Sequence, residues 1–124
     1  MVFQDIMLDF GAIQVDAVLF TSPIAQALAR ILPCSIRLQK WGNELYGPID
    51  KDLGEDRPTS NLPSGSIAYT NQGNYICFFF GQAPAWPVEY IGHISDFGLE
   101  QLIRHPFQKS VTLKQKSPTE KRFP

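Results

Sequence analysis

Proline and glycine set the strongest limit on what this chain can form. Ten prolines and nine glycines are spread over 124 residues, and both residue types interrupt regular helices and strands. Only short elements fit between them. β-Branched and aromatic residues fill many of these short segments, which favours a sheet-rich sandwich or barrel.

The composition indicates one folded domain. Apolar residues make up 44% of the chain and charged residues 19%, in a mass of 14.0 kDa, which excludes a disordered chain. No apolar run approaches the ~20 residues of a membrane-spanning helix. The first eleven residues carry acids where a signal peptide needs basic residues, and the net charge of −1 gives no argument for nucleic acid. We expect a soluble, cytoplasmic protein with neither a membrane nor a nucleic acid as partner.

Alternating apolar residues predict most of the strands. In 2–10, Ile6, Leu8 and Phe10 fall on one side of an extended chain, and in 13–19 every second residue is apolar. This alternation is typical of half-buried strands, and Asp9-Phe10-Gly11 fits a hairpin turn between them. Further strands are predicted at 36–41, 45–49, 66–70, 75–80 and 88–94, with a last one near 111–113. The segment 75–80 is apolar on both faces and should be buried on both sides. The polar segment 50–65 is predicted to be a long loop.

Two short helices are predicted between the strands. Ser22 precedes Pro23 and is expected to accept hydrogen bonds from the first turn of a helix, which Pro33 ends. A stripe of apolar residues at helical spacing supports this helix: Ile24, Leu28, Ile31 and Leu32. Asp96 is expected to cap the second helix, which Pro106 ends.

Four stretches of the sequence carry a resemblance to a known fold. They are 21–33, 40–46 with its Trp-Gly-Asn-Glu, 63–69, and 77–84 followed by 90–94. Together they resemble the cyclophilin-like fold, and most closely a small family of bacterial and archaeal cyclophilin-like proteins with no established activity. The resemblance implies a mainly β fold: a closed barrel of about eight strands with two short helices. We expect a single domain over 1–116, followed by a flexible basic tail at 117–124.

The resemblance also implies a site. True cyclophilins bind proline peptides in a groove on the barrel wall, where an arginine near the prolyl nitrogen weakens the amide resonance. Between Trp41 and Asp50 this sequence has no arginine or lysine, and Glu44 brings the opposite charge. We therefore expect the groove to be present without efficient prolyl isomerase activity.

The candidate groove residues are Lys40, Trp41, Asn43, Glu44, Tyr46, Tyr69, Phe79 and Trp86. Trp86 lies between prolines in a loop, where a binding role is more expected than a core role. Asn43 and Glu44 are candidate polar anchors in an otherwise apolar site. The faces that Glu44 and Tyr46 occupy stay open, because Gly42 permits a bulge. The sequence predicts no catalytic residue, no metal site and no cofactor.

Three functions follow from these expectations. The first is a binding module for a small molecule or an extended, proline-containing peptide. The second is a prolyl isomerase that uses an unconventional cation such as Lys40. The third is a structural or subunit-type domain, with an oligomer as a possible state. Cys34 and Cys77 are expected to be free thiols.

Overall fold

Residues 3–116, which the computed structural model describes, form nine strands and two short helices. The strands are β1 (Gln4–Asp9), β2 (Gln14–Leu19), β3 (Cys34–Arg37), β4 (Gln39–Trp41), β5 (Glu44–Pro48), β6 (Ser66–Thr70), β7 (Tyr75–Phe79), β8 (Glu89–Ile94) and β9 (Ser110–Gln115), and the helices are α1 (Pro23–Ala29) and α2 (Asp96–Arg104). One sheet contains all the strands in the order β3-β9-β1-β2-β8-β6-β7-β5-β4. The predicted mainly β barrel with two short helices is confirmed, with nine strands in place of about eight.

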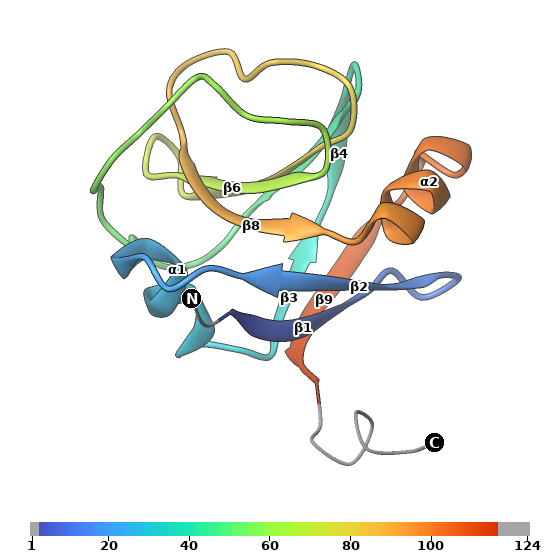
Figure 1. Cartoon of the computed structure of the whole chain (residues 1–124), viewed down its shortest axis with the longest axis horizontal. Coiled ribbons are helices and arrows are strands. Elements are labelled where there is room, and N and C mark those ends of the chain that lie inside the picture. Colours follow the sequence, from blue (N-terminus) through green and yellow to red (C-terminus); the bar gives the residue numbers. More distant parts are fainter. Residues whose placement is uncertain (1–2, 117–124) are drawn as a thin grey trace.

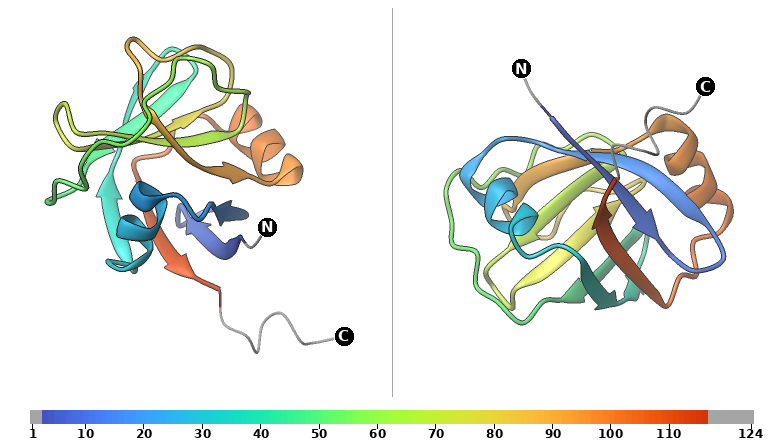
Figure 2. Two further views of the ribbon diagram at one scale, coloured as in Figure 1. Left: turned by 60° about the vertical axis from the view of Figure 1, so that its left-hand side comes forward. Right: turned by 90° about the horizontal axis from the view of Figure 1, so that it is seen from below.

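The sheet curls into a nearly closed barrel (Figures 1 and 2). Its two edge strands, β3 and β4, are consecutive in the chain and only Leu38 separates them. The backbone N–H of Leu38 donates to the carbonyl of Lys109, 2.9 Å away. Gly47 in β5 passes so close to Arg37 that a Cβ there would meet the Arg37 carbonyl oxygen. The single strand predicted at 36–41 is therefore two strands, because the chain crosses from one edge to the other at Leu38.

The interior of the barrel holds the main hydrophobic core. Alternate residues of the strands point inward, among them Ile6, Leu8, Val15, Leu19, Leu45, Ile67, Tyr69, Ile76, Phe78, Ile91, Val111 and Leu113. Both helices add to this core, α1 through Ile24 and Leu28 and α2 through Leu102. The two helices lie at opposite sides of the molecule (Figures 1 and 2).

A second, smaller apolar cluster lies on the other face of the sheet. It consists of Ala68, Cys77, Phe79 and Val88, with Tyr46, Leu62 and Tyr75 packed against it. Strand β7 is consequently buried on both faces, as its continuous apolar sequence predicted.

The two helix starts differ from the prediction. The hydroxyl of Ser22 makes no hydrogen bond within the described chain; instead its backbone carbonyl accepts from the N–H of Gln26 at 2.9 Å. At α2 the cap is Ser95, whose Oγ accepts from the N–H of Gly98 at 3.0 Å. Asp96 is already in the first helical turn, so its carboxylate faces the positive end of the helix dipole without being the cap.

The long loop at 50–65 is attached to the sheet by Glu89. Its buried carboxylate accepts from the backbone N–H groups of Asp56 and Arg57 at 2.9 and 3.1 Å. Thr59 and Val88 add a short antiparallel bridge between the loop and the start of β8. These contacts explain why a polar loop of this length keeps one path across the barrel.

Two further predictions concern the C-terminal tail and membrane-spanning helices. The basic tail predicted at 117–124 lies outside the described residues. Within 3–116, neither helix has the length and apolar character needed to cross a membrane.

Candidate ligand-binding pocket

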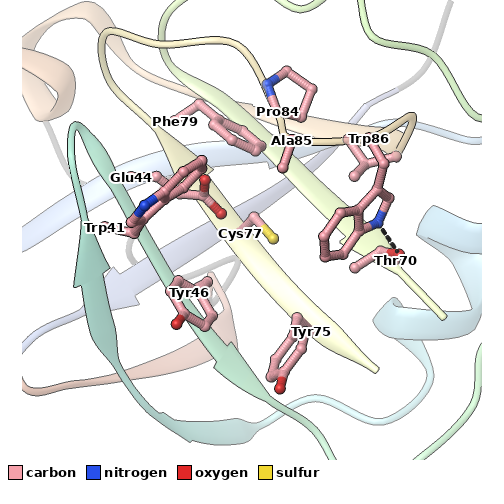
Figure 3. A pocket seen from close by; sticks show the side chains of 11 residues that line it. Trp41, Glu44, Tyr46, Thr70, Tyr75, Cys77, Phe79, Pro84, Ala85 and Trp86 are labelled. Atoms are coloured by element: carbon pink, nitrogen blue, oxygen red, sulfur yellow. Dashed lines mark hydrogen bonds between the residues drawn. The ribbon is translucent and has the colours of Figure 1, made fainter. Parts of the chain in front are cut away.

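A pocket of about 360 Å³ lies on the outer face of the barrel wall (Figure 3). Strands β4, β5, β6 and β7 form its floor and one side, and the loop between β7 and β8 covers the other side. It is lined by Trp41, Glu44, Tyr46, Thr70, Tyr75, Cys77, Phe79, Pro84, Ala85, Trp86 and Val88. Most of this lining is apolar or aromatic, as in ordinary ligand sites.

Strand pairing decides which residues reach the pocket. In the register of β4, β5 and β7, Glu44 stands opposite both Trp41 and Phe79, and Tyr46 stands opposite Cys77. Side chains that are directly opposite share a face of the sheet, so these five residues line the same side. The residues between them, such as Leu45 and Phe78, point into the barrel.

Two tryptophans flank the opening. Trp41, at the end of β4, is 54% exposed, and Trp86, in the covering loop, is 39% exposed. The indole N–H of Trp86 donates to the hydroxyl of Thr70 at 3.0 Å, which fixes the loop to the end of β6 (Figure 3). The ring faces of both tryptophans are therefore accessible to a ligand.

Glu44 is the charged group of this site. Its side chain is 6% exposed, and burial raises the pKa of the carboxyl from 4.5 to about 7, although hydrogen bonds with Cys77 and Gln82 act in the opposite direction. Burial also raises the pKa of the Cys77 thiol, and the neighbouring Glu44 raises it further. A thiol whose pKa is raised in this way is a poor nucleophile.

Gln82 positions Glu44. Its side-chain oxygen accepts from the backbone N–H of Asn43 at 2.6 Å, and the same side chain hydrogen-bonds Glu44. Gly42 adopts a positive φ of 60° in this turn, and a Cβ there would collide with Gln82. The turn between β4 and β5 is thus shaped so that one glutamine can hold both the backbone and the carboxyl.

Five of the eight candidate residues predicted from the sequence lie together in this pocket. They are Trp41, Glu44, Tyr46, Phe79 and Trp86. The sequence left open which face of the strand Glu44 and Tyr46 occupy. In the structure both face the pocket on the outside of the barrel.

The other three candidates lie elsewhere. Lys40 is on the opposite face of β4, with its ammonium 5.1 Å from the centre of the Phe107 ring. Asn43 is exposed in the turn, and its backbone carbonyl accepts from the N–H of Phe80. Tyr69 is fully buried in the barrel core, where its hydroxyl donates to the Asn74 side chain at 2.6 Å.

Sequence reasoning missed six lining residues: Thr70, Tyr75, Cys77, Pro84, Ala85 and Val88. Tyr75 and Cys77 follow from Phe79 by alternation in one strand, and this signal was available once Phe79 was a candidate. Thr70 lines the pocket where Tyr69 was predicted to, because successive residues of β6 face opposite sides of the sheet. The contribution of the covering loop depends on its path, which no periodicity encodes.

The fold and the pocket can now be compared with known proteins. The chain matches the model of the cyclophilin-like family over residues 4–114, and it belongs to that family. No curated protein sequence matches it.

Solved structures of other proteins share this fold. One is the solution structure of the hypothetical protein AF2241 from Archaeoglobus fulgidus, which is 23% identical, with a TM-score of 0.73, over 93% of this chain and 96% of that one. Another is the structure of McbB in complex with tryptophan, 16% identical with a TM-score of 0.70 over 91% of this chain. The match spans 44% of the McbB chain. At these identities the likeness extends to the fold alone.

Proposed function

We propose that this cyclophilin-like domain is a binding module that holds a small organic molecule in the outer pocket. The observation that carries the proposal is the pocket itself: aromatic walls from two separate segments surround a single carboxyl. A volume of about 360 Å³ is at the small end of ordinary ligand sites. It suits a molecule with one or two rings, or the proline ring of an extended peptide.

The aromatic walls indicate the shape of the ligand. Trp41 and Trp86 offer accessible ring faces, and flat rings pack well against such faces. The McbB structure is described as a complex of that protein with tryptophan. An indole ring is therefore a reasonable first probe for this pocket.

The prolyl isomerase alternative gains no support from the pocket. Among residues 3–116, no lysine or arginine lines it, and Lys40 faces the other side of β4. A cation close to the prolyl nitrogen is what would lower the barrier to rotation. We infer that a bound proline would be held without being turned over efficiently.

The subunit-type alternative would be favoured by a broad exposed apolar surface. The large apolar side chains that are most exposed, Phe97 and Phe107, lie on α2 and just after it, and they are not part of the pocket. An oligomer that uses that surface would be compatible with an open pocket.

A titration with indole tests the binding proposal. Indole should shift the backbone amide resonances of β5, β7 and the loop at 81–88, with a Kd that is roughly high micromolar to millimolar for so small a molecule. Trp86→Ala should weaken binding severalfold, whereas Phe97→Ala, which removes an exposed ring on α2, should leave it unchanged. If neither indole nor a proline peptide shifts these resonances, the proposal is wrong.

A further inference from the structure

We propose that the ligand of this pocket is a small amine, whose ammonium group pairs with Glu44 while its apolar body packs between the aromatic walls. This inference rests on the proposed function and narrows it to one chemical class. It follows from three features of the site: the charge that is present, the polar atoms that are already used, and the ring faces around them.

The first feature is a carboxyl without a counter-charge. Glu44 is almost fully buried at the edge of the pocket (Figure 3), and none of the ion pairs in the described part of the chain includes it. A buried carboxylate is costly unless a cation is paired with it. A ligand cation would supply this missing partner, whereas a ligand anion would be repelled.

The second feature is that three other polar side chains of the pocket already have partners. The Thr70 hydroxyl accepts from Trp86, the Tyr46 hydroxyl donates to Gln39 at 3.0 Å, and the Cys77 thiol hydrogen-bonds Glu44. A carboxylate has about four lone-pair positions, so Glu44 retains capacity for a donor. An ammonium group is a charged donor that fits this remaining capacity of Glu44.

The third feature is the group of five aromatic side chains that line the pocket together with the carboxyl. Trp41, Tyr46, Tyr75, Phe79 and Trp86 line the same pocket, and aromatic faces attract ammonium groups that lie over them. Aromatic faces and one carboxylate together favour an amine over a neutral ring of the same size.

The affinity should depend on pH in a defined direction. The pKa of Glu44 is raised to about 7 because of its burial, so an arriving cation favours the ionised form and releases a proton. Cys77, Tyr46 and Tyr75 are the other titratable groups that line the pocket with Glu44. A primary amine stays protonated in this range, since its pKa is close to the roughly 10.4 of lysine. Binding should therefore tighten about tenfold between pH 6 and pH 8.

Three matched probes test the inference: phenethylamine, 2-phenylethanol and 3-phenylpropionate, which share one ring and differ in charge. Titrations followed by amide resonances at pH 8 should give the amine a Kd at least about tenfold below that of the alcohol, with the acid weakest. In Glu44→Gln the amine and the alcohol should bind alike, and the change between pH 6 and pH 8 should disappear.

The outcomes separate the two proposals. If the alcohol binds in the pocket as tightly as the amine, or the acid binds best, the amine inference is overturned and the binding module stands. If none of the three probes shifts the pocket resonances although indole or a proline peptide does, the amine inference alone is overturned. If indole and the proline peptide also fail to shift them, both proposals fail. Because the wild-type comparison alone decides the first case, the test does not depend on the folding of Glu44→Gln.

Discussion

The indole nitrogen of Trp86 donates a 3.0 Å hydrogen bond to the hydroxyl of Thr70, and this bond joins the covering loop of the pocket to β6. Thr70→Val keeps the shape of the side chain and removes the oxygen that accepts from Trp86 and, at 3.1 Å, from the backbone N–H of Gln72. We expect indole affinity to fall severalfold, because Trp86 would no longer be held in place. The free energy of unfolding should fall by only about 1 kcal/mol, since the partly exposed indole can bond to water instead. Amide-resonance titration and urea unfolding measure the two effects.

Thr112→Val is the matched control for that experiment. The Thr112 hydroxyl hydrogen-bonds Ser35 at 2.9 Å between β9 and β3, and neither residue lines the pocket. Thr112→Val should lower the free energy of unfolding by a similar amount and leave the Kd for indole unchanged. Equal losses of affinity in the two variants would show that the Trp86 bond does not organise the pocket.

The stability of the protein should depend on pH through Glu44. Its pKa is 4.5 as an ordinary side chain and about 7 in the fold, chiefly because of burial. Below pH 4.5 the group is protonated in both states and costs nothing. As the pH rises to about 7, the unfolded chain releases a proton that the folded chain keeps, so the free energy of unfolding falls. Above pH 7 the full loss remains.

The comparison with Glu44→Gln isolates this effect. The difference in unfolding free energy between wild type and this variant should shift against the wild type by at most about 3 kcal/mol between pH 4.5 and pH 8, at about 1.4 kcal/mol per pKa unit. Urea unfolding at several pH values measures it. Glu100→Gln, at an exposed ion pair on α2, should show no such trend. A pH profile of Glu44→Gln that is parallel to that of wild type would contradict the raised pKa.

The two cysteines should be free and unequally protected. Cys34 is half-buried in β3, and Cys77 is buried in the pocket floor, where burial and Glu44 raise the pKa of its thiol. Thiol titration of the unfolded, unreduced protein should find two thiols per chain. In native Cys34→Ser, Cys77 should react at least about tenfold more slowly at pH 8 than it does after unfolding. Rapid labelling of the native variant would mean that the thiol is ionised and accessible.

Prolyl isomerisation should be barely accelerated. The uncatalysed barrier is about 18–20 kcal/mol, and lowering it here would require a cation in a pocket that Glu44 makes acidic. An NMR exchange assay on a proline peptide should give rates close to those without protein. Lys40→Ala should change nothing, because Lys40 faces Phe107 on the other side of β4. A strong wild-type rate that Lys40→Ala abolishes would restore the isomerase alternative.

Sequence patterns predicted the barrel better than the pocket. Alternation located most strands because each has one face in the barrel core, but it cannot show where a strand bends. The break at Leu38 was therefore missed, and with it the ninth strand. In β6, Tyr69 was the more attractive binding residue by chemistry, yet Thr70 faces the pocket. A shift of one residue along a strand moves each side chain to the other face of the sheet. Only the pairing with the neighbouring strands determines which residues face the pocket.

The alternation of faces along the strands has a consequence for how this barrel can evolve. In β5 and β7 the even and odd positions belong to different compartments: Leu45 and Phe78 to the interior, Glu44 and Cys77 to the pocket. Substitutions at pocket positions can therefore alter what is bound while the interior packing is retained. Inserting one residue within β7 would instead exchange both sets at once and damage the fold. Point substitutions can therefore change the ligand preference of such a barrel, whereas the lengths of its strands have to stay the same.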